Sequence, residues 1–166
     1  MSSLIKIEDM SVAFATPRGN LKAVRNVSLE LGVGESLGVV GESGSGKTVL
    51  SRAIMGLLPG TATRTGNVYY QGQLISEMPR DEVRKLWGTG MAMIFQDPMT
   101  ALNPVRRIGD QLTESLRVRL DMPKKEAKAK AIELMKRVRI PDPQGMMRKF
   151  PYQLSGGMRQ RIMIAI

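Results

Sequence analysis

The sequence predicts an α/β fold in which an antiparallel β layer lies beside a strand–loop–helix core, and a helical subdomain is inserted after the core. Three observations support this. A short apolar run at residues 36–40 precedes a glycine-rich loop and a stretch with helical apolar spacing. Apolar residues alternate near the N-terminus, which is typical of strands with one buried face. Between residues 101 and 140, apolar residues recur three and four positions apart, which is typical of helices.

The first strand is expected near the N-terminus, where the alternation of apolar side chains changes parity once. These side chains are Ile5, Ile7, Met10, Val12 and Phe14. The change of parity predicts a bulge or break near Asp9. Residues 16–20 read TPRGN and predict a turn. Apolar residues then alternate again over 27–31, which predicts a second strand of the antiparallel layer.

Residues 41–48 read GESGSGKT and fit the phosphate-binding pattern G-x-x-x-x-G-K-[ST] at every fixed position. The preceding run, SLGVV at 36–40, is suited to a buried parallel strand. A helix is expected after the loop, with Leu50, Ala53 and Leu57 on one face and a stop at 58–60, which reads LPG. Strand, glycine-rich loop and helix are the context that this motif requires. An ordinary glycine-rich turn with an incidental lysine is the weaker reading.

The residue types of the loop indicate how it would bind a nucleoside triphosphate. Glycines let the backbone turn tightly and bring its N–H groups to phosphate oxygens, and the following helix directs its N-terminal dipole at the same anion. Lys47 can reach the β- and γ-phosphates, and the Thr48 hydroxyl can ligate Mg²⁺. The nucleotide contacts are therefore expected from Gly41, Glu42, Ser43, Gly44, Ser45, Gly46, Lys47 and Thr48.

The rest of the chain changes from strands to helices. A hairpin is expected over 66–75, a short helix over 79–87, and a second central strand at the apolar run 91–95. Two helices follow, with a break at Met122-Pro123; their apolar positions are Ile108, Leu112 and Leu116, then Ala127, Ala131, Leu134 and Val138. We therefore divide the chain into a nucleotide-binding core at 1–99, a helical subdomain at 100–152 and a final segment at 153–166.

Composition restricts the class of protein. The 166 residues contain no Cys and no His, which excludes disulfides and the commonest metal ligand. The N-terminus has no signal-peptide pattern, and no apolar stretch approaches the ~20 residues that span a bilayer, so we expect a soluble cytosolic domain. Residues 101–166 hold 15 Lys/Arg against 6 Asp/Glu, whereas residues 1–100 hold 10 against 9. This asymmetry indicates either an anionic partner or solvated helix faces.

Residues 154–161 read LSGGMRQR and form a second informative motif. Ser155 is suited to cap a helix, and Gly156 and Gly157 allow an anion to approach the backbone closely. A helix N-terminus of this composition is a phosphate-binding element, although Ser-Gly-Gly also occurs in ordinary caps. Arg159 and Arg161 are assigned no role in the site.

With the phosphate loop, this motif resembles the ATP-binding cassette (ABC) family over essentially the whole chain. The resemblance identifies Ser155, Gly156 and Gly157 as the family's signature and Gln96 as its Q-loop glutamine. It also identifies Phe14 as the aromatic residue that stacks on adenine, although a core aromatic is equally compatible with that position. The stretch MIFQDPMTALNP around Gln96 is most similar to the dipeptide, oligopeptide and nickel importers, and glutathione importers share much of it.

The resemblance implies an ATPase with ATP and Mg²⁺ as cofactors, in which Gln96 and Lys47 are catalytic and Thr48 and Gln96 hold the metal. Two cassettes, identical or different, would pair so that the signature of one contacts the γ-phosphate bound by the other. The implied partners are transmembrane permease subunits and an extracytoplasmic solute-binding protein, with no nucleic acid. The implied location is peripheral, on the cytoplasmic face of the inner membrane, where ATP hydrolysis energises uptake of peptides or a related small solute.

The sequence departs from the family after the signature. The family's apolar strand ending in Asp and Glu, and its later His, have no counterpart before Ile166. We therefore expect a C-terminally incomplete cassette that binds ATP and is inactive in hydrolysis by itself. Two alternatives remain open, namely a soluble ABC protein acting on nucleic acid or ribosomes and a non-hydrolysing remnant that binds nucleotide.

Overall fold

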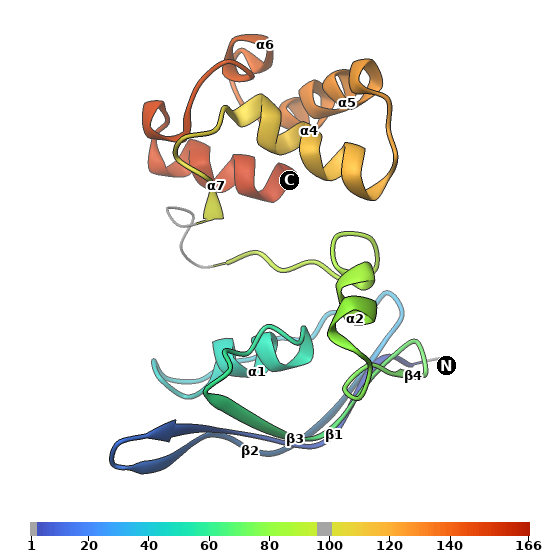
Figure 1. The fold of residues 1–166 in the computed structure, drawn as a ribbon, viewed down its shortest axis with the longest axis vertical. Coiled ribbons are helices and arrows are strands. Elements are labelled where there is room, and N and C mark those ends of the chain that lie inside the picture. Colours follow the sequence, from blue (N-terminus) through green and yellow to red (C-terminus); the bar gives the residue numbers. More distant parts are fainter. Residues whose placement is uncertain (1–2, 96–100) are drawn as a thin grey trace. The chain divides into compact units, whose positions relative to one another are not determined.

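The computed structural model describes residues 3–95 and 101–166, so Gln96 lies outside the described residues. The chain forms two compact units, which we call the sheet unit (Met1–Trp87) and the helical unit (Gly88–Ile166) (Figure 1). The domain limits expected from the sequence remain a prediction. Among the helices of the described ranges, none combines the length and apolar character needed to cross a membrane.

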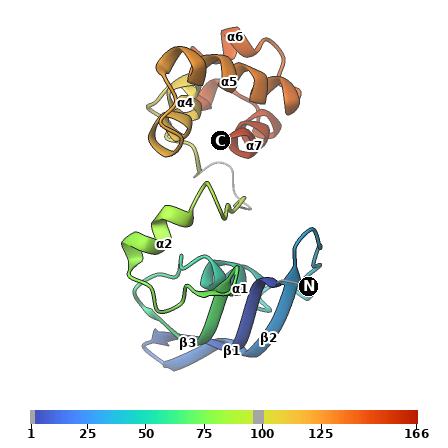
Figure 2. The same ribbon diagram turned by 90° about the vertical axis from the view of Figure 1, so that its right-hand side faces the viewer.

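The sheet unit contains one four-stranded antiparallel sheet, in the order β2-β1-β3-β4. Figure 2 shows β2, β1 and β3 next to one another. The strands are β1 (Ser3–Thr16), β2 (Gly19–Gly32), β3 (Ala62–Tyr70) and β4 (Gln73–Leu74). The predicted strands at the N-terminus and the predicted hairpin are therefore confirmed. Gln71 and Gly72, at φ +50° and +80°, form the tight turn between β3 and β4.

The predicted bulge in β1 is also present. Pairing with β2 shifts between Ile7 and Met10, and Asp9 has a φ of +47°. Its backbone N–H donates to the Ser28 hydroxyl at 2.9 Å instead of continuing the ladder. Because the extra residue restores the parity, Ile7, Met10 and Val12 are all fully buried.

Helix α1 (Lys47–Ile54) packs on β1 and β2 and buries Leu50 and Ala53. It ends before the predicted stop at 58–60, because Gly56 adopts a left-handed φ of +67°. Helix α2 (Arg80–Leu86) follows the hairpin as predicted. It is tied to the end of α1 by the indole of Trp87, whose N–H donates to the Met55 carbonyl at 3.0 Å.

The two predicted central strands are wrong for the described structure. Residues 36–40 form no strand and are exposed, with Val40 at 93%. In the second run only Met91 makes a bridge, and Ile94 is 60% exposed. A central parallel strand takes its hydrogen bonds from strands on both sides, and the only sheet among the described residues is β1–β4. The two apolar runs therefore have a composition suited to strands, but among the described residues they have no strand to pair with.

The helical unit confirms the predicted helical faces. Its elements are α4 (Ile108–Arg119), α5 (Lys124–Arg137), α6 (Pro143–Met146), a 3-10 helix (Pro151–Gln153) and α7 (Gly156–Ala165). The core contains three of the predicted positions, Ile108, Leu112 and Ala131, and partly buried Leu116, Leu134 and Val138 pack against it. Its other members are Leu102, Met135, Ile140, Met146, Leu154, Ile162 and Ala165. The charged residues at the start of α5 lie on its exposed face, as predicted.

Candidate functional site

The phosphate loop connects residues 36–40 to α1 inside the sheet unit. Gly46 is the N-cap of α1, with φ +91°, and no side chain of the described residues caps the helix. The amides of the first turn are therefore available to an anion, which the helix dipole also favours. Thr48 lies in this turn and is exposed, so its hydroxyl is accessible.

The Lys47 ammonium lies over the loop that precedes it. Its Nζ donates to the carbonyl oxygens of Gly41 and Glu42, each at 2.7 Å, and contacts the Ser45 hydroxyl at 3.3 Å. The Ser45 N–H in turn donates to the Glu42 carbonyl at 3.2 Å. These bonds hold the positive charge within the ring of residues 41–47, where a phosphate oxygen would take the place of one of the three acceptors of the ammonium.

One close approach explains a glycine of the loop. At Gly46 a Cβ would lie 2.3 Å from the carbonyl oxygen of Ala23 on β2, so the loop backbone rests directly against the sheet. At Gly41 a Cβ would lie 2.8 Å from the Ser45 hydroxyl, which can rotate away. Gly44 has φ +82° and open space around it, so its glycine is needed for the backbone conformation alone.

A cavity of about 880 Å³ adjoins the loop. One wall is β2, from Leu21 to Leu29, and the other is formed by residues 37–41, 44–47 and Leu50. This volume is in the range of small-molecule sites, with mostly apolar walls and polar groups at the loop. Phe14 pairs across the sheet with Leu21, which lines the cavity, so the predicted adenine-stacking residue is one strand away from it.

The signature motif forms the N-terminus of α7 in the helical unit. Ser155 is the N-cap, and its hydroxyl accepts from the Met158 N–H at 3.3 Å, which confirms the predicted cap. A Cβ on Gly156 or Gly157 would meet no atom within 4 Å, so this helix end is open for a ligand to approach. Leu154 and Ile162 are buried on either side of the cap and anchor it in the core.

The structure groups the predicted residues only within each unit. Residues 41–48 are brought together in the sheet unit, Ser155 to Gly157 lie in the helical unit, and Gln96 is outside the described residues. Sequence reasoning missed Gln111, a buried polar residue of α4. Its signal was its position on the predicted apolar face, between Ile108 and Leu112.

The pKa shifts that the structure produces lie outside both motifs. The pKa of Glu8 is lowered chiefly by a hydrogen bond from Lys6, whose pKa is raised by the same pair. The Lys130 hydrogen bond lowers the pKa of Glu133 in the same way. All four groups are on the surface, so these pairs stabilise the protein little. Partial burial lowers the pKa of Arg64, which donates to the Ser76 carbonyl.

We expect Ser155→Ala to lower the free energy of unfolding of the helical unit by about 1 kcal/mol, because the Met158 N–H loses its acceptor. Denaturation followed by circular dichroism without nucleotide measures this, so that the cap is separated from any role in ligand binding. Ser155→Asp is the matched control, since its carboxylate can also cap the helix. Equal stability of the alanine variant and the parent protein would contradict the cap.

Comparisons with known proteins match both units. The model of a family described as "ABC transporter" matches residues 24–166. The oligopeptide transport ATP-binding protein OppD of Escherichia coli (strain K12) is 42% identical over 164 residues, which are 99% of this chain and 49% of OppD. The dipeptide transport ATP-binding protein DppD of Bacillus subtilis (strain 168) is 42% identical over 168 residues, covering 100% of this chain and 50% of DppD.

Among solved structures, the chain resembles the ATP-binding cassette MJ0796 in a dimeric post-hydrolysis state bound to ADP and Pi. The TM-score is 0.83 at 26% identity, and the match covers 97% of this chain and 67% of that one. The predicted cassette fold is thereby confirmed. The chain spans about half the length of the curated relatives it matches.

Proposed function

The chain belongs to the ABC transporter family, and from this we propose that it supplies the nucleotide-binding groups of an ATP-hydrolysing subunit that energises the import of peptides or a related small solute. The observation that carries the proposal is the phosphate loop, where Lys47 lies over the ring of residues 41–47 beside an uncapped helix N-terminus. The similarity to OppD and DppD, ATP-binding proteins of oligopeptide and dipeptide transport, supports the solute class.

The residues present fit ATP with Mg²⁺. The loop amides and Lys47 would hold the β- and γ-phosphates, and Thr48 would donate its hydroxyl oxygen to the metal. The described residues contain no cluster of three or more acidic or other metal-ligating side chains. This suits Mg²⁺, which is usually held by nucleotide phosphates and one or two protein oxygens. Gln96 is proposed as the further metal and water ligand, and Phe14 as the adenine neighbour.

The partners are proposed from the same premise. A second cassette would place its signature, equivalent to Ser155, Gly156 and Gly157, at the γ-phosphate bound by this loop, and the dimeric state of MJ0796 supports such pairing. Permease subunits would bind it at the cytoplasmic face of the membrane, with a solute-binding protein outside. We also keep the expected domain limits of 1–99, 100–152 and 153–166 as part of this proposal.

We further propose that the segment 1–166, taken alone, binds ATP without turning it over. Within residues 1–166 no apolar run is followed by an Asp-Glu pair. Cleavage of a triphosphate requires a group that orients or activates the attacking water, and Lys47 and the loop amides stabilise charge without supplying it. We therefore expect residues 1–166 to bind ATP and the same preparation to release no phosphate.

The test is titration of the chain with a fluorescent ATP analogue and Mg²⁺, together with an assay of released phosphate. Lys47→Met should weaken binding about tenfold to hundredfold, because charge-assisted bonds to the phosphates are lost. Lys125→Met, which removes an exposed lysine of α5, is the control and should bind normally. Equal binding by Lys47→Met and the parent chain would refute the phosphate site, and steady phosphate release would refute the proposed lack of turnover.

The excess of basic residues in 101–166 favours a second candidate, a soluble ABC protein acting on nucleic acid or ribosomes. The two candidates differ in salt dependence. Binding to RNA or DNA that falls steeply with salt would support the second, since phosphate contacts release counterions. Absence of such binding at about 50 mM salt would leave the importer subunit as the function.

A further inference from the structure

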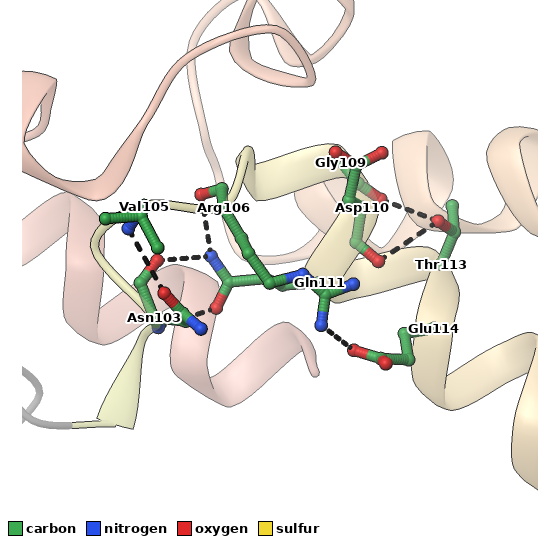
Figure 3. A network of polar contacts seen from close by, with 8 residues as sticks. All are labelled: Asn103, Val105, Arg106, Gly109, Asp110, Gln111, Thr113 and Glu114. Atoms are coloured by element: carbon green, nitrogen blue, oxygen red, sulfur yellow. Dashed lines mark hydrogen bonds and ion pairs between the residues drawn. The ribbon is translucent and has the colours of Figure 1, made fainter.

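The first turn of α4 holds a polar side chain inside an apolar core. Gln111 is only 9% exposed, and its neighbours Ile108 and Leu112 are core residues. Figure 3 shows the Gln111 amide pointing at the turn that precedes the helix, with Asn103 and Arg106 converging on it. A buried polar group of this kind is stable only if its hydrogen bonds are satisfied.

All hydrogen-bonding groups needed by the Gln111 amide come from residues 103–106. Its Nε2 donates to the carbonyl oxygens of Asn103 and Arg106, each at 3.0 Å, and its Oε1 accepts from the Asn103 N–H at 2.9 Å. The Asn103 side chain also accepts from the Val105 N–H at 3.1 Å. Two donors and one acceptor are required at this place, and a glutamine amide is the side chain that provides them.

The same helical turn holds a second segment through its backbone. The Ile108 N–H donates to the Lys149 carbonyl at 2.9 Å, and the Gly109 N–H to the Met147 carbonyl at 3.0 Å. A Cβ at Gly109 would lie 2.7 Å from the Met147 oxygen, so the two backbones are in direct contact.

The held segment leads directly into the signature. The Phe150 N–H donates to the Gln153 side chain at 2.9 Å, and a 3-10 helix over Pro151–Gln153 follows. Pro151 and Leu154 are buried, and Ser155 caps α7 immediately afterwards. The path from the start of α4 to the signature is therefore a continuous series of hydrogen bonds and packed residues.

We propose that Gln111 is a positioning residue for the signature: by holding residues 103–106 against the first turn of α4, it fixes the turn whose N–H groups hold residues 147–150 and so orients Ser155 and the N-terminus of α7. The consequence for nucleotide rests on the proposed function, in which the signature contacts the γ-phosphate. The placement of the signature segment itself does not rest on that function and is tested without nucleotide.

Gln111→Glu converts this arrangement into one that depends on pH. The new oxygen would face the carbonyl oxygens of Asn103 and Arg106, and burial among them raises the pKa of the introduced carboxyl. While protonated, the carboxyl can donate to one of these carbonyls. Because its pKa is raised in the folded state, this bonding is present at low pH and is lost as the pH rises through that raised value.

The measurement is amide hydrogen exchange of the whole chain between about pH 5 and pH 8, corrected for intrinsic rates. In Gln111→Glu we expect exchange in residues 103–106 and 147–158 to become about tenfold faster, relative to the parent, as the carboxyl ionises. Exchange in the middle of α5 should change little. Other charged groups near this turn, namely Arg106, Arg107, Asp110, Glu114 and Lys149, are identical in both proteins and cancel in the comparison.

Two further variants keep the test decisive. Gln144→Glu adds the same charge at an exposed position of the helical unit and should show no pH-dependent change. Gln111→Met has similar volume and no donors, so it should loosen both segments at every pH. Protection of 147–158 equal to the parent in both Gln111 variants would overturn the proposal. Uniform loss of protection over the whole helical unit would also overturn it, because Gln111 would then support only general stability.

Measurements with ATP distinguish this inference from the proposed function. At protein concentrations low enough to keep the chain monomeric, ATP affinity should be the same in the parent and Gln111→Glu, because the phosphate loop belongs to the sheet unit. ATP-dependent self-association, measured by sedimentation, should weaken in Gln111→Glu at pH 8 and recover near pH 5. A parent chain that binds no ATP would refute the proposed function, whereas the exchange result would still decide the role of Gln111.

Discussion

Gly46→Ala is expected to abolish detectable nucleotide binding, with a loss of affinity of more than about a hundredfold. The left-handed φ of +91° already disfavours any residue with a Cβ, by about 1–2 kcal/mol. The Cβ would also lie 2.3 Å from the Ala23 carbonyl oxygen, which belongs to a sheet strand and cannot rotate away. The loop must therefore leave β2, and the Lys47 ammonium and the first-turn amides lose their common arrangement.

Gly44→Ala is the matched control for this experiment. Gly44 lies in the same loop at a similar φ of +82°, but a Cβ there would meet no atom within 4 Å. It should lose only the part of the affinity that backbone strain accounts for, about tenfold. Titration with the fluorescent ATP analogue compares the two variants, with circular dichroism to confirm that both are folded. Similar losses in both would show that the contact with β2 is unimportant.

Gly66→Ala is expected to destabilise the sheet unit by about 3 kcal/mol or more. Gly66 lies in β3 opposite the bulge of β1, with φ +84°, and a Cβ would lie 2.5 Å from the backbone oxygens of both Glu8 and Asp9. Relief of this overlap requires β1 and β3 to separate where Ile7 and Met10 are buried. The left-handed strain alone costs about 1–3 kcal/mol, and the overlap adds to it.

The comparison for Gly66 is Gly72→Ala, in the turn between β3 and β4. Gly72 has nearly the same φ, +80°, with open space around it, so its variant should lose only about 1–2 kcal/mol. Urea denaturation followed by tryptophan fluorescence reports on this unit, since Trp87, the only tryptophan, belongs to it. Equal midpoints for the two variants would exclude the close contact at the bulge as a source of stability.

Elements with internal hydrogen bonds were predictable from the sequence. Helices α4 and α5 follow from apolar spacing, and the Ser155 cap follows from its place before Gly156. The change of parity in β1 also indicated the bulge at Asp9. In each case the signal and the structure concern neighbours along the chain, so the pattern alone contains the needed information.

The predictions of strands at 36–40 and 91–95 were wrong, because a local pattern is not enough to predict this kind of strand. A parallel strand is defined by partners distant in sequence, and an apolar run states only that a segment can be buried. Gln111 shows a similar limit for the site. Its position on an apolar face was visible in the sequence, but only the fold shows that residues 103–106 supply two acceptors and one donor to it.

The sequence by itself determined that this chain carries a phosphate loop at 41–48 and a signature-like helix cap at Ser155, because both motifs are local and their chemistry lies in consecutive residues. Only the tertiary structure explains why particular glycines are required and which polar residue supports the signature. Gly46 and Gly66 are fixed by carbonyl oxygens of β2 and β1, and Gln111 by a turn that packs against it. These constraints arise from contacts between segments, which no local pattern records.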